Sequence, residues 1–254
     1  MLLPVTRSVF INARSLIGRS VTALHIQNNG GDDAMLIAMA SAWKVQARSV
    51  KNHGGDLLRL KQLNLSGNPA ISDAGVVALA SSIEVGAAPA LEWLSLAQLG
   101  FGSDGAKAVA VALCSASCVV KTLALSHNRV GVAGKSAVAE ALGQQSCSLT
   151  DLQMSRMQWD CDGAALLAKA LELNSTLLSL DLGGNALGLK GICAIGWALS
   201  ENNQTLTSLQ LWNNSGLNIT GSGTGEEQSD IDEVLQTISQ TLQDNVSQLI
   251  SVCY

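Results

Sequence analysis

The sequence is poor in aromatic residues, which make up 3% of its 254 residues. It also contains only three prolines and no apolar run that approaches the roughly 20 residues of a membrane-spanning helix. A core built mainly from Leu, Val, Ile and Ala suits thin, closely stacked layers better than one bulky centre. We therefore expect a soluble protein without membrane contacts, and a repeated architecture becomes a serious possibility.

Positive charge is scarce and unevenly placed. The formal net charge is −5, and no basic cluster is interleaved with aromatic residues, so we expect no binding to nucleic acid. No Lys or Arg follows Lys190, whereas seven acids do: Glu201, Glu226, Glu227, Asp230, Asp232, Glu233 and Asp244. One end of the molecule should therefore be acidic.

Paired cysteines are missing as well. The six cysteines form no C-x-x-C pair of a zinc site, and a chain of this length needs no disulfide framework. We expect free, mostly buried thiols, no metal or other cofactor, and a cytoplasmic location, with the nucleus as the alternative. Arg7, Arg14 and Arg19, with no acid before Asp32, faintly resemble a mitochondrial transit peptide, but Val21 already belongs to the repeat described next.

Pairs of apolar residues two positions apart recur through most of the chain. They are Leu24/Ile26, Leu63/Leu65, Leu94/Leu96, Leu123/Leu125, Leu152/Met154, Leu180/Leu182 and Leu209/Leu211, and the successive steps are 39, 31, 29, 29, 28 and 29 residues. A further apolar residue precedes each pair by three positions. Five positions after the first member of a pair stands Asn29, Asn68, Asn128, Asn185 or Asn214, with Leu99 and Met157 in the other two units.

This pattern resembles the leucine-rich repeat signature L-x-x-L-x-L-x-x-N, and the period and Ala-rich helices resemble its ribonuclease-inhibitor-like subclass, as in NLR receptor repeats and Ran GTPase-activating proteins. The resemblance implies an α/β solenoid with a parallel sheet on its concave side and helices on its convex side. We expect an N-terminal cap or partial repeat at 1–19, about seven repeats at 20–217, and an acidic loop, capping helix and terminal partial repeat at 218–254.

Three local features carry further expectations. Leu99 and Met157 cannot form the bonds of the usual Asn, so we expect water or a neighbouring carbonyl to close these two turns and the turns to differ in shape. The glycines Gly75, Gly105, Gly134, Gly163 and Gly191 are interpreted as turns into the helices. The insertion at 216–229 should be a loop, after which Ser229 caps a helix with Ile231, Leu235, Ile238 and Leu242 on one face.

The segment Gly100-Phe101-Gly102-Ser103-Asp104-Gly105 spells the G-x-G-x-x-G of a dinucleotide-binding turn and lies between an alternating run and a helical run. A dinucleotide site also needs an acid near twenty residues further on, and none occurs between Asp104 and Glu140. We therefore interpret the motif as a structural variation of the repeat.

Catalytic groups are few and scattered. The three histidines (25, 53 and 127) cannot be assembled into a triad or a metal site, and the cysteines have no acid–base partner at a suitable spacing. We expect no enzyme. Six N-x-S/T sequons (Asn64, Asn174, Asn203, Asn213, Asn218 and Asn245) are better explained by the preference of the repeat for Asn at turns than by glycosylation.

The outward face of the parallel sheet has the best claim to function because a solenoid makes it an extended concave platform. The candidate partner-binding residues on it are Trp93, His127, Asp151, Arg156, Asp181, Trp212 and Asn213. Trp is favoured as an interface anchor, although each indole could instead cover a flank of the solenoid. Trp197 could mark a second contact on the helical side or pack beneath the C-terminal cap.

Three hypotheses of function follow. The leading hypothesis is a non-catalytic scaffold, monomeric by itself, that binds a protein partner through its concave face. The alternatives are a regulator of an enzyme, either ribonuclease-inhibitor-like or small-GTPase-activator-like, and the sensor fragment of an NLR-like receptor. Fold alone does not decide between them.

Overall fold

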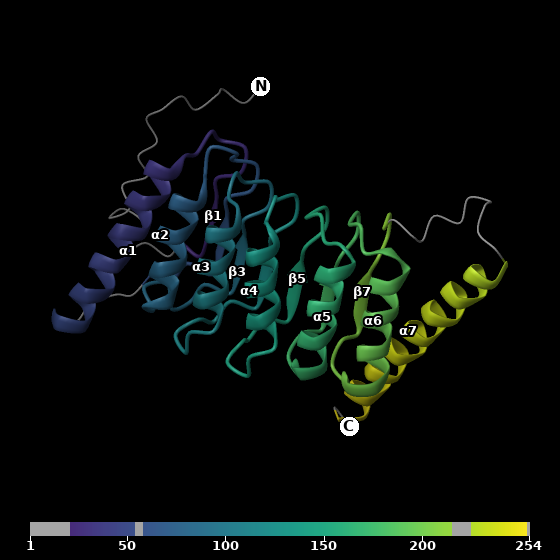
Figure 1. Cartoon of the computed structure of the whole chain (residues 1–254). Coiled ribbons are helices and arrows are strands. Elements are labelled where there is room, and N and C mark those ends of the chain that lie inside the picture. Colours follow the sequence, from purple (N-terminus) through teal and green to yellow (C-terminus); the bar gives the residue numbers. More distant parts are fainter. Residues whose placement is uncertain (1–20, 54–57, 215–224, 253–254) are drawn as a thin grey trace, which may run out of the picture.

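The computed structural model describes residues 21–53, 58–214 and 225–252, and within the last helix it describes the side chains of residues 232–245. The expected N-terminal cap at 1–19 and most of the expected loop at 216–229 lie outside the described residues. The described chain alternates strands and helices along its length (Figure 1).

Seven strands of three residues each form one parallel sheet in sequence order. They are β1 (Ala23–His25), β2 (Gln62–Asn64), β3 (Trp93–Ser95), β4 (Thr122–Ala124), β5 (Asp151–Gln153), β6 (Ser179–Asp181) and β7 (Ser208–Gln210). The first leucines of the apolar pairs are in register across all seven strands. The repeat period therefore sets the pairing, because a shift of one residue would turn every leucine to the other face.

Seven helices form a second layer beside the sheet (Figure 1). They are α1 (Asp33–His53), α2 (Asp73–Glu84), α3 (Ser103–Leu113), α4 (Val132–Leu142), α5 (Cys161–Leu173), α6 (Gly188–Asn202) and α7 (Gly225–Val252). Each helix packs against the next one along the chain. The fold class is an α/β leucine-rich repeat solenoid, as the sequence predicted.

The core lies between the two layers. Both leucines of the inner pairs, such as Leu63 with Leu65 and Leu180 with Leu182, are fully buried. Leu24 in β1 and Leu209 in β7 are only partly buried. They lie in the first and last strands, where the sheet has a neighbour on one side only.

The interpretation of the repeated glycines as turns is wrong. Gly75 and Gly105 are the third residues of α2 and α3, and both are buried inside the first helical turn. A Cβ at Gly134 would come within 3.0 Å of the Ala106 side chain, and one at Gly191 within 2.7 Å of the Ala164 side chain. Gly134 and Gly191 therefore allow neighbouring helices to approach closely, whereas a Cβ at Gly163 would meet Trp159 of its own repeat.

The two end helices are longer than those between them. The extra residues of the first repeat continue α1 to His53. The last helix begins at Gly225 and not after a cap at Ser229, and it runs on to Val252, so a helix occupies part of the expected terminal partial repeat. Ile238 of α7 is buried as predicted, Leu235 and Leu242 are half-buried, and the side chain of Ile231 lies outside the described residues. Gly196 leaves room for Ile238 and Val234 to pack on α6.

Candidate functional site

The turn after each strand contains one residue with a left-handed backbone, immediately before the repeat asparagine position. We call these residues the positive-φ row; they are Asn28, Gly67, Gln98, His127, Arg156, Gly184 and Asn213, with φ between 51° and 72°. Backbone N–H groups of the first six donate to carbonyls of the next repeat, for example His127 to Ser155 at 2.9 Å and Arg156 to Gly183 at 2.9 Å. The row therefore continues the hydrogen-bond pairing of the sheet beyond the C-terminal ends of the strands. We call this edge of the sheet, with the turns that follow the strands, the turn edge.

Buried asparagines join four of these turns, those after β2, β4, β6 and β7, to the preceding one. Asn68 Nδ2 donates to the carbonyls of Leu65 and, in the repeat before, Ile26, while its Oδ1 accepts from the backbone of Asn29 and Gly31. Asn128 and Asn185 repeat this arrangement. An unpaired buried backbone group costs about 1–3 kcal/mol, so each asparagine stabilises two repeats at once.

The expectation that water or a neighbouring carbonyl replaces the missing side-chain bonds at Leu99 and Met157 stays a prediction, but the backbone N–H of each residue bonds to the asparagine of the next repeat, as that of Asn29 does. The Leu99 N–H donates to Asn128 Oδ1, and the Met157 N–H donates to Asn185 Oδ1, both at 2.9 Å. In the Met157 turn Gln158 takes a φ of 59°, as Gly30 does with a φ of 66° in the Asn29 turn, so the expected difference in shape stays a prediction. The ammonium of Lys135, a buried side chain, donates to the Gln158 carbonyl there.

A second group of asparagines, seen in the sequence only as sequons, closes the other ends of the helices. Asn174 donates to the Leu142 carbonyl at 2.7 Å, and Asn203 donates to the Leu171 carbonyl at 2.8 Å. Asn203 also donates to the Asn174 carbonyl at 3.1 Å, and in the same way Asn245 of α7 donates to the Asn203 carbonyl at the end of α6 at 3.4 Å, besides the Leu206 carbonyl at 2.7 Å. All three side chains are buried, so the terminal helix supplies the bond that another repeat would otherwise make.

The G-x-G-x-x-G segment is occupied by a group of the protein itself. Asp73 Oδ1 accepts from the N–H groups of Gly102 at 2.9 Å and Gly105 at 2.6 Å. A carboxylate from the preceding repeat thus lies at the N-terminus of α3, where a dinucleotide-binding turn would hold phosphate. The interpretation of this motif as structural is confirmed.

Trp212 and Arg156 are in contact on the turn edge. They belong to the repeats that contain β7 and β5, which are separated by the repeat that contains β6. The Arg156 guanidinium lies over the Trp212 ring at 5.5 Å from its centroid. Gly183 and Gly184 lie in the intervening repeat, and a Cβ at Gly183 would overlap the indole. Because Gly183 and Gly184 have no side chains, the Trp212 indole and Arg156 pack directly on their backbone, which we call the shelf. Trp212 is nevertheless 45% exposed.

The other predicted residues lie in two places. Asp181 accepts a hydrogen bond from Gly183 N–H at 2.8 Å, and His127 and Asn213 are exposed members of the positive-φ row. Trp93 and Asp151 instead begin β3 and β5, at the opposite end of the strands. Trp93 is half-buried and stacks on His25 with ring centroids 6.4 Å apart. The structure therefore groups five of the seven candidates at the turn edge.

Residues on the helical side are less concentrated. Trp197 of α6 is 68% exposed, so it does not pack beneath α7. Of the five described cysteines, Cys118 and Cys147 are buried and the other three are half-buried. Burial raises the pKa of the Cys118 and Cys147 thiols above the ordinary value, despite a hydrogen bond from a backbone N–H to each. Little thiolate therefore forms at neutral pH, which disfavours reactivity.

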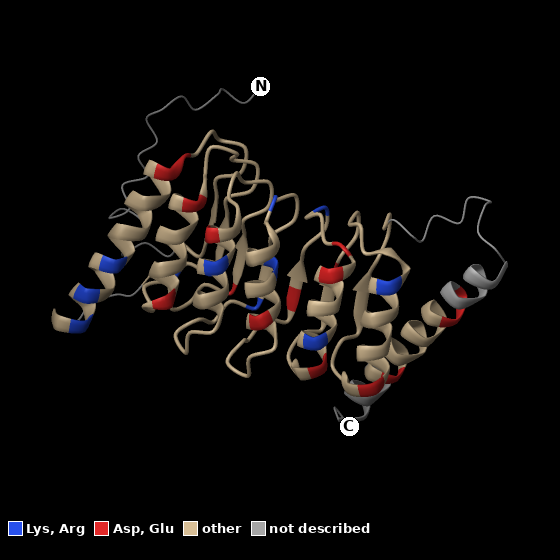
Figure 2. Ribbon diagram, viewed as in Figure 1, with Lys and Arg blue, Asp and Glu red and all other residues tan. Residues whose placement is uncertain are grey.

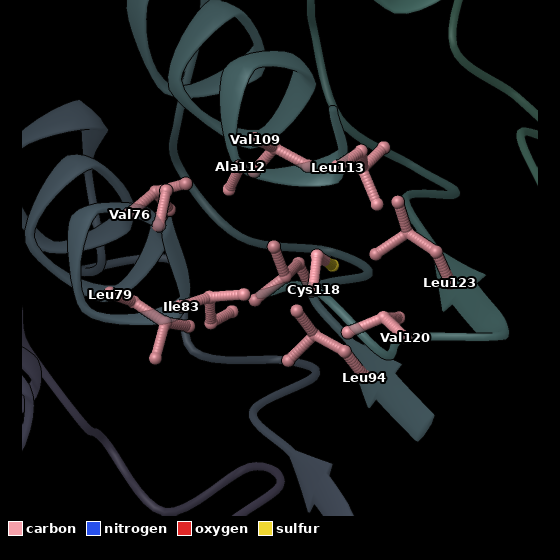
Figure 3. A pocket seen from close by; sticks show the side chains of 12 residues that line it. Val76, Leu79, Ile83, Leu94, Val109, Ala112, Leu113, Cys118, Val120 and Leu123 are labelled. Atoms are coloured by element: carbon pink, nitrogen blue, oxygen red, sulfur yellow. The ribbon is translucent and has the colours of Figure 1, made fainter. Parts of the chain in front are cut away.

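Two hollows in the described residues are smaller than the roughly 300–1,000 Å³ of typical ligand pockets. An apolar cavity of about 10 Å³ lies between α2, α3 and the strands behind them, with Leu79, Ile83 and Cys118 among its lining residues (Figure 3). A more polar hollow of about 170 Å³ lies where α6 ends beside α7. Within the described residues, no cluster of three potential metal ligands was found, and no helix is long and apolar enough to cross a membrane.

Comparison with known proteins agrees with the repeat architecture. Residues 60–80 and 173–196 match the leucine-rich repeat family. Together with the seven in-register strands, these matches support the assignment of a leucine-rich repeat solenoid fold. A search of curated protein sequences found no match.

Two solved structures show a weaker likeness. The tropomodulin C-terminal domain of Caenorhabditis elegans is 14% identical, with 82% of this chain and 98% of that chain covered and a TM-score of 0.40. The leiomodin-1 actin-binding site 2 is 13% identical, with 98% and 99% covered and a TM-score of 0.32. Both TM-scores are below 0.5, so neither likeness bears on what this chain binds.

Proposed function

We propose that this chain is a non-catalytic scaffold that binds a protein partner through the open face of its sheet, with the turn edge around Trp212 as the anchor. The observation that carries the proposal is the Trp212 indole, which is held in place by Gly183 and Arg156 and yet stays 45% exposed. A rigid, exposed indole loses little conformational entropy on binding and supplies a large contact area.

The same proposal includes the state and class of the protein. We propose that the protein is a monomer in the cytoplasm. We also propose the ribonuclease-inhibitor-like subclass, because the repeats from β2 to β7 are 28 to 31 residues long and Ala-rich helices lie behind them. Identification of the partner would distinguish a scaffold from a regulator of a ribonuclease or small GTPase, because these functions differ in what is bound.

The test is affinity purification with mass spectrometry, using the wild-type chain and Trp212→Ala. We expect a specific protein to be recovered with the wild type and depleted at least about tenfold with the variant, as for an interface anchor. Trp197→Ala is the matched control because Trp197 is an exposed indole on the helical side. Circular dichroism would establish that both variants fold.

The proposal fails if partners are recovered in full after Trp212→Ala, Arg156→Ala and Asp181→Asn are combined in one folded protein. Loss of the same partners with Trp197→Ala alone would move the binding surface to the helices.

A further inference from the structure

The turn edge of the repeats containing β4 and β5 carries exposed positive charge. His127 and Arg156 belong to the positive-φ row, and Arg129 follows in the same turn as His127; all three are exposed. Figure 2 shows Lys or Arg in the two turns that follow β4 and β5. Side chains in equivalent positions of neighbouring strands lie about 4.8 Å apart, so His127 and Arg156 are neighbours along the row, with Arg129 in the same turn as His127 and Trp212 in contact with Arg156.

Two neighbouring carboxylates are engaged within the protein. Asp160 accepts from Gly163 N–H at 2.9 Å as the N-cap of α5 and lies 3.9 Å from the Lys135 ammonium. Asp181 accepts from Gly183 N–H beneath the indole. Both carboxylates are thus held by bonds within their own repeats or to Lys135, and the contact of the Arg156 guanidinium that the structure shows is with the face of the Trp212 ring.

Stacking on an indole leaves the edge of a guanidinium free to donate paired hydrogen bonds to a carboxylate. Trp212, in contact with that guanidinium, is 45% exposed and offers an apolar surface to a side chain of a bound segment. We infer that the strip formed by His127, Arg129, Arg156 and Trp212 binds an acidic segment of a protein partner that carries an aromatic or large aliphatic residue next to Asp or Glu. This inference rests on the proposed function and specifies the chemistry of the partner.

The probe is a phage-displayed library of random peptides of about 12 residues. An extended peptide of this length is longer than the distance across the four repeats, β4 to β7, that carry the strip. Selection on the immobilised wild-type chain should enrich Asp and Glu next to one aromatic or large aliphatic residue. The best selected peptide is then synthesised with a fluorophore, and its affinity is measured by anisotropy.

Affinity should fall at least about tenfold with Arg156→Ala or Trp212→Ala, and by a smaller factor with Arg156→Lys, which keeps the charge but loses the planar paired donors. Gly183→Ala should weaken binding by displacing the indole without changing either binding residue. Trp197→Ala and Gly143→Ala are controls that should bind as the wild type does. Affinity should also fall as NaCl is raised from about 50 to about 200 mM.

Selected peptides that are neutral or basic but still depend on Trp212 would overturn the acidic preference and leave the proposed function standing. Peptides indifferent to every turn-edge substitution, or no selected peptide, would overturn the inference, and the proposed function is then judged by its own purification experiment. A single-stranded oligothymidylate that binds more tightly than the selected peptide, and loses binding with Arg156→Ala, would assign the strip to nucleic acid and also overturn the inference.

Discussion

Single residues decide how the turn edge is shaped. The shelf exists because Gly183 and Gly184 have no side chains where most neighbouring repeats have Ser, Ala, Gln, His or Arg. Gly184 also has a φ of 66°, a conformation in which most side chains are strained, whereas Gly183 does not. Substitution of Gly183 therefore tests whether the indole needs this space, without the backbone strain that a substitution of Gly184 would add.

Gly183→Ala should move the Trp212 indole, because the new Cβ overlaps the ring. We expect a shift of the Trp212 indole N–H resonance and loss of its contact with Arg156, while the fold is retained. Gly143→Ala is the control, since its Cβ would meet other atoms at 3.6 Å or more. An unmoved Trp212 resonance in the Gly183 variant would contradict the shelf.

Leu182→Ala should lower the free energy of unfolding by about 2–5 kcal/mol, because Leu182 is fully buried and the truncation leaves a cavity. Val132→Ala, at a side chain that is 74% exposed, should change it by less than about 0.5 kcal/mol. Urea denaturation measures both. A loss below about 1 kcal/mol at Leu182 would be incompatible with its inward position.

At the scale of elements, the start of one helix is bonded to the start of the next. Asp33 of α1 accepts from the backbone and side chain of Ser72 and from the Gly75 backbone, as Asp73 of α2 does from Gly102 and Gly105. Each carboxylate satisfies N–H groups at the positive end of a helix dipole in the next repeat. These bonds connect repeats through the helix layer as the asparagines do through the turns.

Acidification should weaken the Asp33 connection. Burial alone raises the pKa of Asp33, but the hydrogen bonds from Ser72 and Gly75 outweigh it and lower the pKa below its ordinary value. A lowered pKa in the folded state contributes stability above the unfolded pKa of about 3.9, and that contribution is lost as the pH falls through the folded pKa.

Asp33→Asn should therefore be less stable than the wild type at pH 7, and the difference should shrink as the pH falls below about 4. Urea midpoints measured from pH 7 to pH 3 would show this convergence. Asp104→Asn is the control, because that carboxylate is exposed and pairs with Lys107 on the surface. A difference between wild type and Asp33→Asn that is the same at every pH would argue against the assigned bonds.

At the scale of the whole molecule, the described helices and strands pack mainly on those of neighbouring repeats, while the Arg156–Trp212 and His25–Trp93 contacts each reach across one repeat. Each helix packs on the next, and α7 packs on α6 at one end. Stability in such an array is approximately a sum of repeat and interface terms, so a local defect should loosen the repeats beside it more than those far away.

Ile238→Ala should test this, because Ile238 is the buried side chain with which α7 packs near Gly196. We expect faster amide hydrogen exchange in α6 and β7 and unchanged exchange in α2 and β2. Ser239→Ala, one position away and exposed, is the control. Equal acceleration throughout the described repeats would show instead that the array unfolds as one unit.

Much of this arrangement could be predicted from the sequence. The spacing of Leu63 and Leu65 predicted a strand with both leucines inward, and the steps of 28 to 31 residues predicted strands in register. The turn edge was predicted less well. The candidates included Arg156 and Trp212 separately, but their contact depends on the two glycines between them. Trp93 was treated like Trp212, whereas it is half-buried against His25.

The sequence by itself determined the period, the inward residues and the class of fold, because these depend on spacing along one repeat. Only the tertiary structure decided what each side chain meets in the next repeat: Asn128 at the Leu99 turn, Asp73 at Gly102, and Arg156 at Trp212. These contacts depend on stacking distances and on which neighbouring side chain is missing or small. A repeat pattern predicts where in its own unit a residue lies, and the packing of units decides its partner.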